Sequence, residues 1–381
     1  MRRTLAAGGL ALALAGPASG ATKLQQMGGS ARPRGDSVPE AQREPMPATF
    51  RWGIQRPDLV RYNRVEGLSL GGRGQIRPET ALGPLSMTAT LRMGSGDRVP
   101  NARLDVARET LERRVTVSVF HELAPMDGDA RHLRLGNSVT GVVFGRDDGA
   151  YYRRSGWSME FTPPSAVRSA FRVRAYAERH DAVESTTDFN LWHLSDGAWT
   201  SRENLPADPG VEFGGLATWS PSWGTDPRRA RGGLEVAIQG AGGDFEYARA
   251  SLIARTVLPL PARLSLALEA AGGTSWGSPP LQRMWFVGGA NSLRGFAPAA
   301  AVGSSFGRGR AELARGFAFG AIVVFSDLGW AGERDDVRMA DVLASLGLGF
   351  SLADGLVRID AARGVRGGGD LRLEFYLDGI P

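Results

Sequence analysis

Short segments in which apolar and polar residues alternate fill most of the chain, a pattern typical of β-strands with one apolar and one polar face. From residue 85 to residue 93, Leu, Met, Ala, Leu and Met occupy every second position. From residue 371 to residue 377, Leu, Leu, Phe and Leu alternate with Arg, Glu and Tyr. Clusters of Gly, Pro, Asp and Asn separate the segments. The pattern predicts an all-β fold.

The length and polarity of the segments distinguish a membrane barrel from a soluble sandwich. A transmembrane strand needs about 9 to 11 residues, and many segments reach that length. Sandwich strands are often shorter and their inner faces bulkier. Here the second face repeatedly carries Arg and Glu, which suits a water-filled lumen, whereas an Arg facing lipid at mid-bilayer costs about 2 to 4 kcal/mol. We therefore predict an antiparallel transmembrane β-barrel and retain the sandwich as the alternative.

The segments number sixteen, an even count as expected for a bacterial barrel. We predict strands at 64–76, 83–95, 101–108, 112–124, 137–145, 150–162, 169–180, 211–222, 230–240, 244–256, 262–272, 303–315, 316–329, 338–351, 355–363 and 370–378. With both termini in the periplasm, each connection from an odd to an even strand is extracellular. Segments 181–210 and 273–302 are then extracellular loops four and six.

The N-terminal residues are typical of an exported protein. Residues 1–21 combine two arginines, an apolar run from residue 5 to residue 15 and a small-residue cleavage zone, which predicts a signal peptide. Residues 22–60 are rich in Pro, Gly, Arg, Gln and Glu without periodicity, which predicts a disordered or extended periplasmic leader. Residues 61–381 form the predicted barrel. The predicted location is the bacterial outer membrane.

Composition narrows the possible partners and cofactors. The chain has no cysteine, which excludes a disulfide framework and a thiolate metal site. It has 45 basic and 40 acidic residues, a net charge of +5, and Lys23 is its only lysine. The arginine excess has two alternative explanations, an anionic partner or a bias in the base composition of the genome. Because the two charge signs are interleaved, we expect no nucleic-acid partner.

Catalytic groups do not gather in the sequence. The adjacent acidic pairs Asp147–Asp148 and Asp335–Asp336 are interpreted as solvated turn residues. The histidines lie on different segments, without the paired spacing of metal ligands or a nearby serine nucleophile motif: His121, His132, His180 and His193. We expect no enzyme activity, no metal and no cofactor.

A glycine-rich motif lies within predicted loop six. Residues 286–296 read Phe-Val-Gly-Gly-Ala-Asn-Ser-Leu-Arg-Gly-Phe. Adjacent glycines allow the tight backbone path of a hairpin tip, and an arginine carries a fixed charge in a fork that matches a carboxylate. The candidate residues of this motif are Gly288, Gly289, Arg294, Gly295 and Phe296.

A second motif follows in the predicted strand at 316–329. In Phe325-Ser-Asp-Leu-Gly329, a spacing of two places Phe325, Asp327 and Gly329 on one face of the strand. The opposite face carries Ile322, Val324 and Leu328. Since apolar residues face lipid, Asp327 is predicted to face the lumen.

Together the two motifs resemble those of the BamA-like outer-membrane assembly and secretion barrels, the bacterial surface antigen superfamily, in which the tip of loop six folds back into the pore. The resemblance implies that Arg294 meets Asp327 in the lumen, with Phe325 near the tip and Gly329 leaving room for it. Asp360 resembles a recurring acidic position in a late strand. The start of the barrel, Arg61–Leu68, resembles the opening of poorly characterised members. The alternative is an ordinary loop arginine and an ordinary lumenal aspartate.

The resemblance also implies a function. In family members that insert or secrete proteins, periplasmic POTRA domains recruit the client chains and partner lipoproteins, and the leader is too short to hold one such domain. We expect insertion or translocation of proteins or lipids, with outer-membrane lipids, client outer-membrane or secreted proteins and separate periplasmic factors as partners. A passive pore or a structural barrel is the alternative, favoured by the missing POTRA domains and the arginine-lined lumen.

Overall fold

The computed structural model describes residues 49–52, 59–81, 83–110, 113–127, 131–163, 169–194, 199–226, 228–338, 341–352 and 357–376. The predicted signal peptide, residues 1–21, and most of the predicted leader, residues 22–60, lie outside the described residues.

The described elements are almost all strands. They are β1 (Thr49–Trp52), β2 (Val60–Asn63), β3 (Gly67–Ile76), β4 (Glu79–Thr80), β5 (Gly83–Gly94), β6 (Pro100–Glu109), β7 (Arg114–Pro125), β8 (Tyr151–Thr162), β9 (Ser169–Ala182), β10 (Gly210–Trp223), β11 (Arg231–Gly243), β12 (Tyr247–Leu260), β13 (Leu264–Gly277), β14 (Trp285–Val287), β15 (Ala301–Gly303), β16 (Ser305–Phe317), β17 (Gly320–Gly332), β18 (Leu343–Leu352), β19 (Val357–Arg366) and β20 (Leu371–Tyr376). The helical elements are η3 (Arg131–Leu133), α1 (Leu135–Phe144) and η4 (Leu281–Arg283).

The wall of the barrel is one antiparallel ladder. It runs through β3, β5 to β13 and β16 to β20, each strand paired with the next in the sequence. Both β1 and β2 pair with the free side of β3: Thr49–Trp52 lies opposite Gly72–Gln75, and Val60–Asn63 lies opposite Gly67–Leu70. The two short strands therefore form one interrupted first strand, and the wall has sixteen strands, as predicted.

The count is right, but one predicted strand does not form and one strand was not predicted. The strand predicted at 137–145 is helix α1. The strand predicted at 64–76 is confirmed as β3, but it is the second wall strand, because β1 and β2 precede it. The wall begins at β1, before the predicted start at residue 61. These errors cancel, so loop six still joins the eleventh and twelfth strands. No helix in the described ranges is long and apolar enough to span a membrane.

Helix α1 is stabilised by its C-terminal end. Gly145 has a left-handed φ of 68°, which suits glycine. Its N–H donates to the carbonyl of Gly141, and the N–H of Arg146 donates to the carbonyl of Thr140. The valines of α1 favour a strand by propensity, so these caps, together with tertiary contacts described below, override local preference.

Alternation along the strands separates a lipid face from a lumen face, as predicted. On β17, Ile322, Val324 and Leu328 are 50–54% exposed, whereas Phe325 and Asp327 are 2% and 0% exposed. On β20, Leu371 and Leu373 point outward and Glu374 is buried. The exposed apolar face suits lipid, and the polar face lines the lumen.

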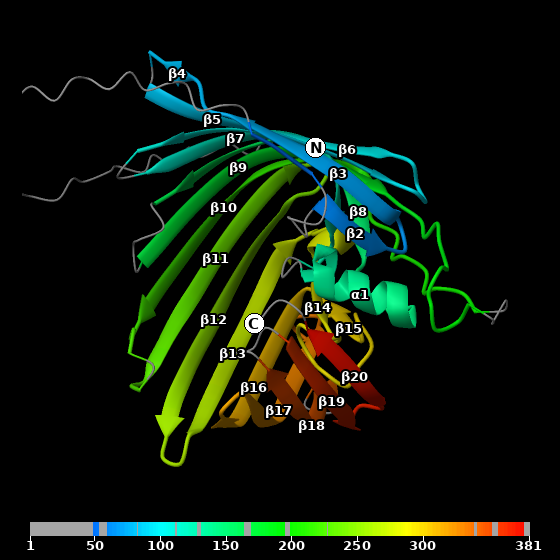
Figure 1. Ribbon diagram of the computed structural model, residues 1–381, viewed down its shortest axis with the longest axis vertical. Helices are drawn as coiled ribbons and strands as arrows, with labels where there is room; N and C mark the ends of the chain where they lie inside the picture. Colours follow the sequence, from blue (N-terminus) through cyan, green and yellow to red (C-terminus); the bar gives the residue numbers. More distant parts are fainter. Residues whose placement is uncertain are drawn as a thin grey trace, which may run out of the picture. The chain divides into compact units, whose positions relative to one another are not determined.

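Four of the connections at one end of the barrel, which we call the loop end, surround the sites described below, and three of them are long. They are loop one (64–66), loop three (126–150), loop four (183–209) and loop six (278–304). Loop six folds into the lumen, where Val287, Leu293 and Phe296 form a buried cluster against Phe306 of the wall. Figure 1 shows β14 and β15 within the curve of the sheet and α1 between β2 and β20.

Candidate functional site in loop six

Loop six enters the lumen as a short hairpin. Its strands β14 and β15 pair with each other, and the tip lies between them. Gly288 and Gly289 have φ values of 128° and 82°, which glycine adopts without strain. The Ser292 hydroxyl donates to the carbonyl of Gly288 at 2.8 Å, and Gly289 N–H donates to the carbonyl of Phe296 at 3.1 Å. The two glycines therefore close the tip on itself and present Arg294.

Arg294 binds carboxylates from three wall strands. Its Nε and Nη2 donate to the two oxygens of Asp327 on β17 at 2.7 and 2.6 Å, a bidentate pair. Its Nη1 donates to Glu312 on β16 at 2.7 Å and to Asp360 on β19 at 2.9 Å. The Arg294 backbone N–H also donates to Asp327 at 3.2 Å. The Arg294 side chain is 1% exposed, so this network is shielded from water.

Two further arginines balance the charge of this network. Arg358 binds Glu312 and Asp360 at 2.9 and 2.7 Å, and Arg310 lies 3.5 Å from Asp327. Three guanidinium groups therefore face three carboxylates, which offsets the cost of burying them. Burial alone would lower the pKa of Arg294, but the hydrogen bonds and the charge of Asp327 outweigh it and raise the pKa. The guanidinium of Arg294 stays charged.

Aromatic and glycine residues shape the cradle around the tip. The guanidinium carbon of Arg294 lies 3.5 Å from the centre of the Phe325 ring, a cation–π contact. A Cβ on Gly329 would lie 2.7 Å from Val287 of loop six, and a Cβ on Gly295 would lie 2.9 Å from the Arg363 backbone of β19. Both glycines therefore allow the tip to lie directly against the wall.

A second arginine anchors the other end of loop six. Arg283, in η4, donates to Glu212 of β10 at 2.5 Å and to Glu178 of β9 at 3.2 Å. It also donates to the Tyr152 hydroxyl of β8 at 3.2 Å. Burial would lower the pKa of Arg283, but electrostatic interactions with nearby Tyr152 and Glu212 outweigh it and raise the pKa. Loop six thus spans the lumen, with Arg294 on the β16–β19 wall and Arg283 on the β8–β10 wall.

Residues next to Arg283 reinforce this second anchor. The buried side-chain amide of Gln282 donates to the backbone carbonyl of Asp208 in loop four at 2.9 Å and lies 3.0 Å from Nδ1 of His180. Glu178, His180 and Glu212 bring ligand atoms within 4.8 Å of one another, a spacing compatible with a metal ion. Arg283 binds both Glu178 and Glu212, and Arg154 and Arg174 also bind Glu178, so these guanidinium groups provide the positive charge that the cluster requires.

Sequence analysis missed the Arg283 anchor. The arginine precedes the recognised motif, and its partners Glu178 and Glu212 lie 105 and 71 residues away. Alternation along the strand could have indicated one of these partners. Glu178 lies at an even spacing from Arg174 and Tyr176, so it shares their face of the strand and faces the lumen. Two lumen-facing acids on neighbouring strands require a cationic partner.

Comparisons with known proteins address the fold. No family model matches the chain, and no curated protein matches its sequence. The structure is similar to that of Haemophilus ducreyi BamA lacking POTRA domains 1–3, with a TM-score of 0.58 and 13% identity over 86% of this chain and 69% of that chain. A comparison with CdiB from Acinetobacter baumannii gives a TM-score of 0.47 and 12% identity over 83% of this chain and 57% of that chain. The chain has the fold of the BamA barrel.

Proposed function

We propose that this protein is an outer-membrane barrel that inserts or translocates protein or lipid substrates at its membrane boundary. The observation that supports this proposal is loop six, which is fixed across the lumen by buried ion pairs at both ends. A lumen crossed by an anchored loop is poorly suited to steady passive flow. The fold shared with BamA supports the same function.

The partners follow from the surfaces of the barrel. The outward face is apolar, so the bilayer lipids are the first partner. Client outer-membrane or secreted proteins, and periplasmic factors encoded separately, are the further partners we propose. The proposal assigns no catalysis, cofactor or metal to the chain, and Arg294 and Arg283 act as positioning residues for loop six.

Depletion of the protein in its own host, followed by quantification of the outer-membrane proteome, tests this proposal. We expect several unrelated barrels to decrease, together with a periplasmic stress response. A complementing copy with the wild-type sequence should restore them. An unchanged proteome and an unchanged lipid composition of the outer membrane would contradict the proposal.

A passive pore is the second candidate, because many arginine side chains face the lumen. Single-channel recordings in planar bilayers distinguish the two candidates. A passive pore requires a high and steady conductance that does not change in the Arg294→Ala variant. For an anchored loop we expect low conductance in the wild type and frequent larger openings in Arg294→Ala.

A further inference from the structure

The seam between the first and last strands is closed by a different kind of contact from the rest of the wall. Among the described residues, which end at Tyr376 on this side, no ladder joins β20 to β1, β2 or β3. Helix α1 contacts both β2 and β20, and Figure 1 shows it lying between them. An unpaired strand edge exposes N–H and C=O groups, so α1 lies where the edges need partners.

On the first-strand side, loop three binds the backbone of β2 and loop one. The hydroxyl of Ser138 on α1 accepts the N–H of Tyr62 at 3.0 Å. The Asp147 carboxylate accepts the N–H of Arg64 at 2.9 Å, and its backbone carbonyl accepts the Arg64 guanidinium at 2.9 Å. Loop three thus supplies acceptors of the kind that a neighbouring strand would otherwise provide.

Asp147 is therefore not the solvated turn residue that the sequence suggested. It is 8% exposed, and its carboxylate also accepts hydrogen bonds from Asn137 at 2.8 Å and from the Tyr151 hydroxyl at 2.7 Å. A carboxylate held by this many donors is a fixed structural element. It joins the end of α1 to loop one, directly after the first strand.

The Arg61–Leu68 stretch forms the dock for loop three. Arg61 and Glu66 make a buried bidentate pair at 2.6 and 2.8 Å. Asn63 and Asn101 donate to the same Glu66 carboxylate at 2.6 and 2.9 Å. This network fixes the turn of loop one, so the groups that face loop three are preorganised.

On the last-strand side, loop three binds β20 through Arg146. Its guanidinium donates to the backbone carbonyl of Leu373 at 2.5 Å and to the Glu374 carboxylate at 3.2 Å. Asp148 lies 3.6 Å from Arg372, also on β20. The Arg146 side chain is 31% exposed, so this side is wetter and weaker than the buried dock on loop one.

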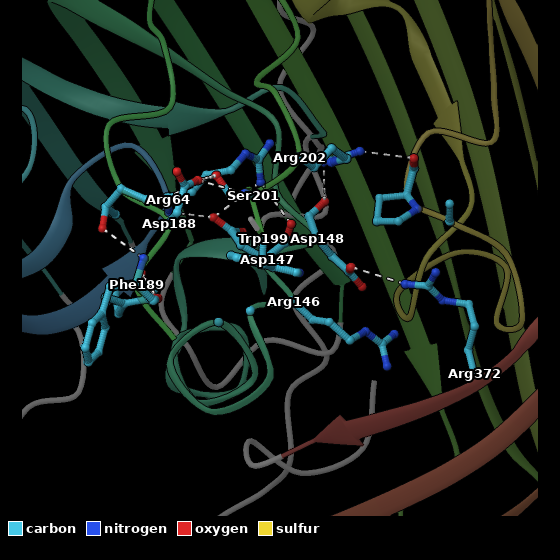
Figure 2. Close-up of a pocket in the computed structure, with 16 residues that line it drawn as sticks. Arg64, Arg146, Asp147, Asp148, Asp188, Phe189, Trp199, Ser201, Arg202 and Arg372 are labelled. Atoms are coloured by element: carbon cyan, nitrogen blue, oxygen red, sulfur yellow. Dashed lines mark hydrogen bonds and ion pairs between the residues drawn. The ribbon is translucent and has the colours of Figure 1, made fainter. Parts of the chain in front are cut away.

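Loop four holds loop three in place from the other side. The N–H groups of Leu191 and Trp192 donate to the carbonyls of Val142 and Val143 at the end of α1, at 2.7 and 3.0 Å. A cavity of about 240 Å³ remains between loops one, three, four and six and β20. Figure 2 shows Arg64, Asp147 and Arg146 around this cavity, with Asp148 directed at Arg372.

We propose that residues 135–149 form a clasp that closes the seam at the loop end by bonding to β2 and β20 in place of strand pairing, and that β20 is the side that releases. The buried Arg64–Asp147 contacts keep the clasp on the first strand. The partly exposed Arg146 contacts detach first, which frees the edge of β20. This inference goes beyond the proposed function and does not depend on it, because it concerns the isolated barrel.

Hydrogen exchange followed by mass spectrometry on the full chain in lipid vesicles tests the clasp. Arg146→Ala removes the contacts with β20, and we expect exchange in residues 371–376 to rise roughly fivefold. Gly141→Leu tests the other side, because a Cβ at this position would already lie 3.1 Å from the Tyr62 ring. It should raise exchange in both 60–63 and 371–376. Arg134→Ala, an exposed residue of the same loop, is the matched control.

The pattern of exchange decides the outcome. A rise confined to the two edges supports the clasp. Wild-type exchange at both edges in both variants would overturn it. An equal rise in β11 and β12, far from the seam in the ladder, would also overturn it, because loop three would then stabilise the whole barrel. The exchange experiment requires no client protein. Its result therefore does not depend on whether depletion of the protein changes the outer-membrane proteome.

Discussion

Replacing Arg294 with alanine tests whether loop six is anchored in the lumen. The substitution removes four side-chain hydrogen bonds to Asp327, Glu312 and Asp360. The network, neutral with three arginines and three carboxylates, then retains Arg310 and Arg358 against three carboxylates and carries a net charge of −1. Two of those carboxylates, Asp327 and Asp360, have fully buried side chains.

The expected cost follows from burial. Breaking a buried ion pair from one side costs about 3 to 5 kcal/mol. Glu312 is 17% exposed, so it gains some hydration when Arg294 is removed. We therefore expect Arg294→Ala to lower the free energy of unfolding by about 3 kcal/mol. Arg294→Lys keeps the charge but loses the fork, and should cost about 1 to 2 kcal/mol.

Urea unfolding in lipid vesicles, followed by tryptophan fluorescence, measures these differences. Protease sensitivity of loop six in the folded barrel gives a local readout that a merely global change would not move. The double variant Arg294→Ala/Asp327→Ala should cost less than the sum of its single variants, because each single variant leaves an unpaired charge. Additive costs, or an Arg294→Ala variant as stable and as protease-resistant as the wild type, would refute this account of the anchor.

Three further substitutions test other parts of the structure. Arg283→Ala should increase quenching of Trp285 fluorescence by a soluble quencher. It removes the cation shared by Glu178 and Glu212, while Arg154 and Arg174 still bind Glu178, so Zn²⁺ should raise the melting temperature of the variant and not of the wild type. Gly295→Ala should destabilise the barrel by about 1 to 3 kcal/mol, because φ is 80° and the wall backbone is close; equal stability would place the tip away from β19. Val324→Arg should cost about 2 to 4 kcal/mol in vesicles, with Val324→Leu as the control, and a cost near zero would place this residue outside the lipid.

Strand faces were predictable from the sequence because alternation is a local signal. The assignment of Phe325 and Asp327 to the lumen needed only their spacing and the apolar character of Ile322 and Val324. The Arg283 anchor was not predictable in the same way, since its acidic partners lie on strands far away in the sequence. To recognise this anchor, the positions of the strands relative to one another along the barrel axis must be known, and alternation does not give these positions.

Helix α1 shows where local reasoning fails. Residues 135–144 carry no charge and several β-branched residues, so propensity favours a strand. The helix forms because Gly145 ends it, because Ser138 binds the first strand and because Asp147 binds loop one. The interrupted first strand was missed for a related reason, since β1 and β2 are each only four residues long and are defined by their partner β3.

The Arg294 network also imposes an order on how the chain reaches its final state. Its carboxylates come from β16, β17 and β19, which follow the arginine by 18, 33 and 66 residues. Because a chain is synthesised from its N-terminus, the arginine is made before any of the groups that neutralise it. The complete network cannot form until the fifteenth wall strand has joined the sheet, so loop six makes its full set of contacts only in a nearly complete barrel.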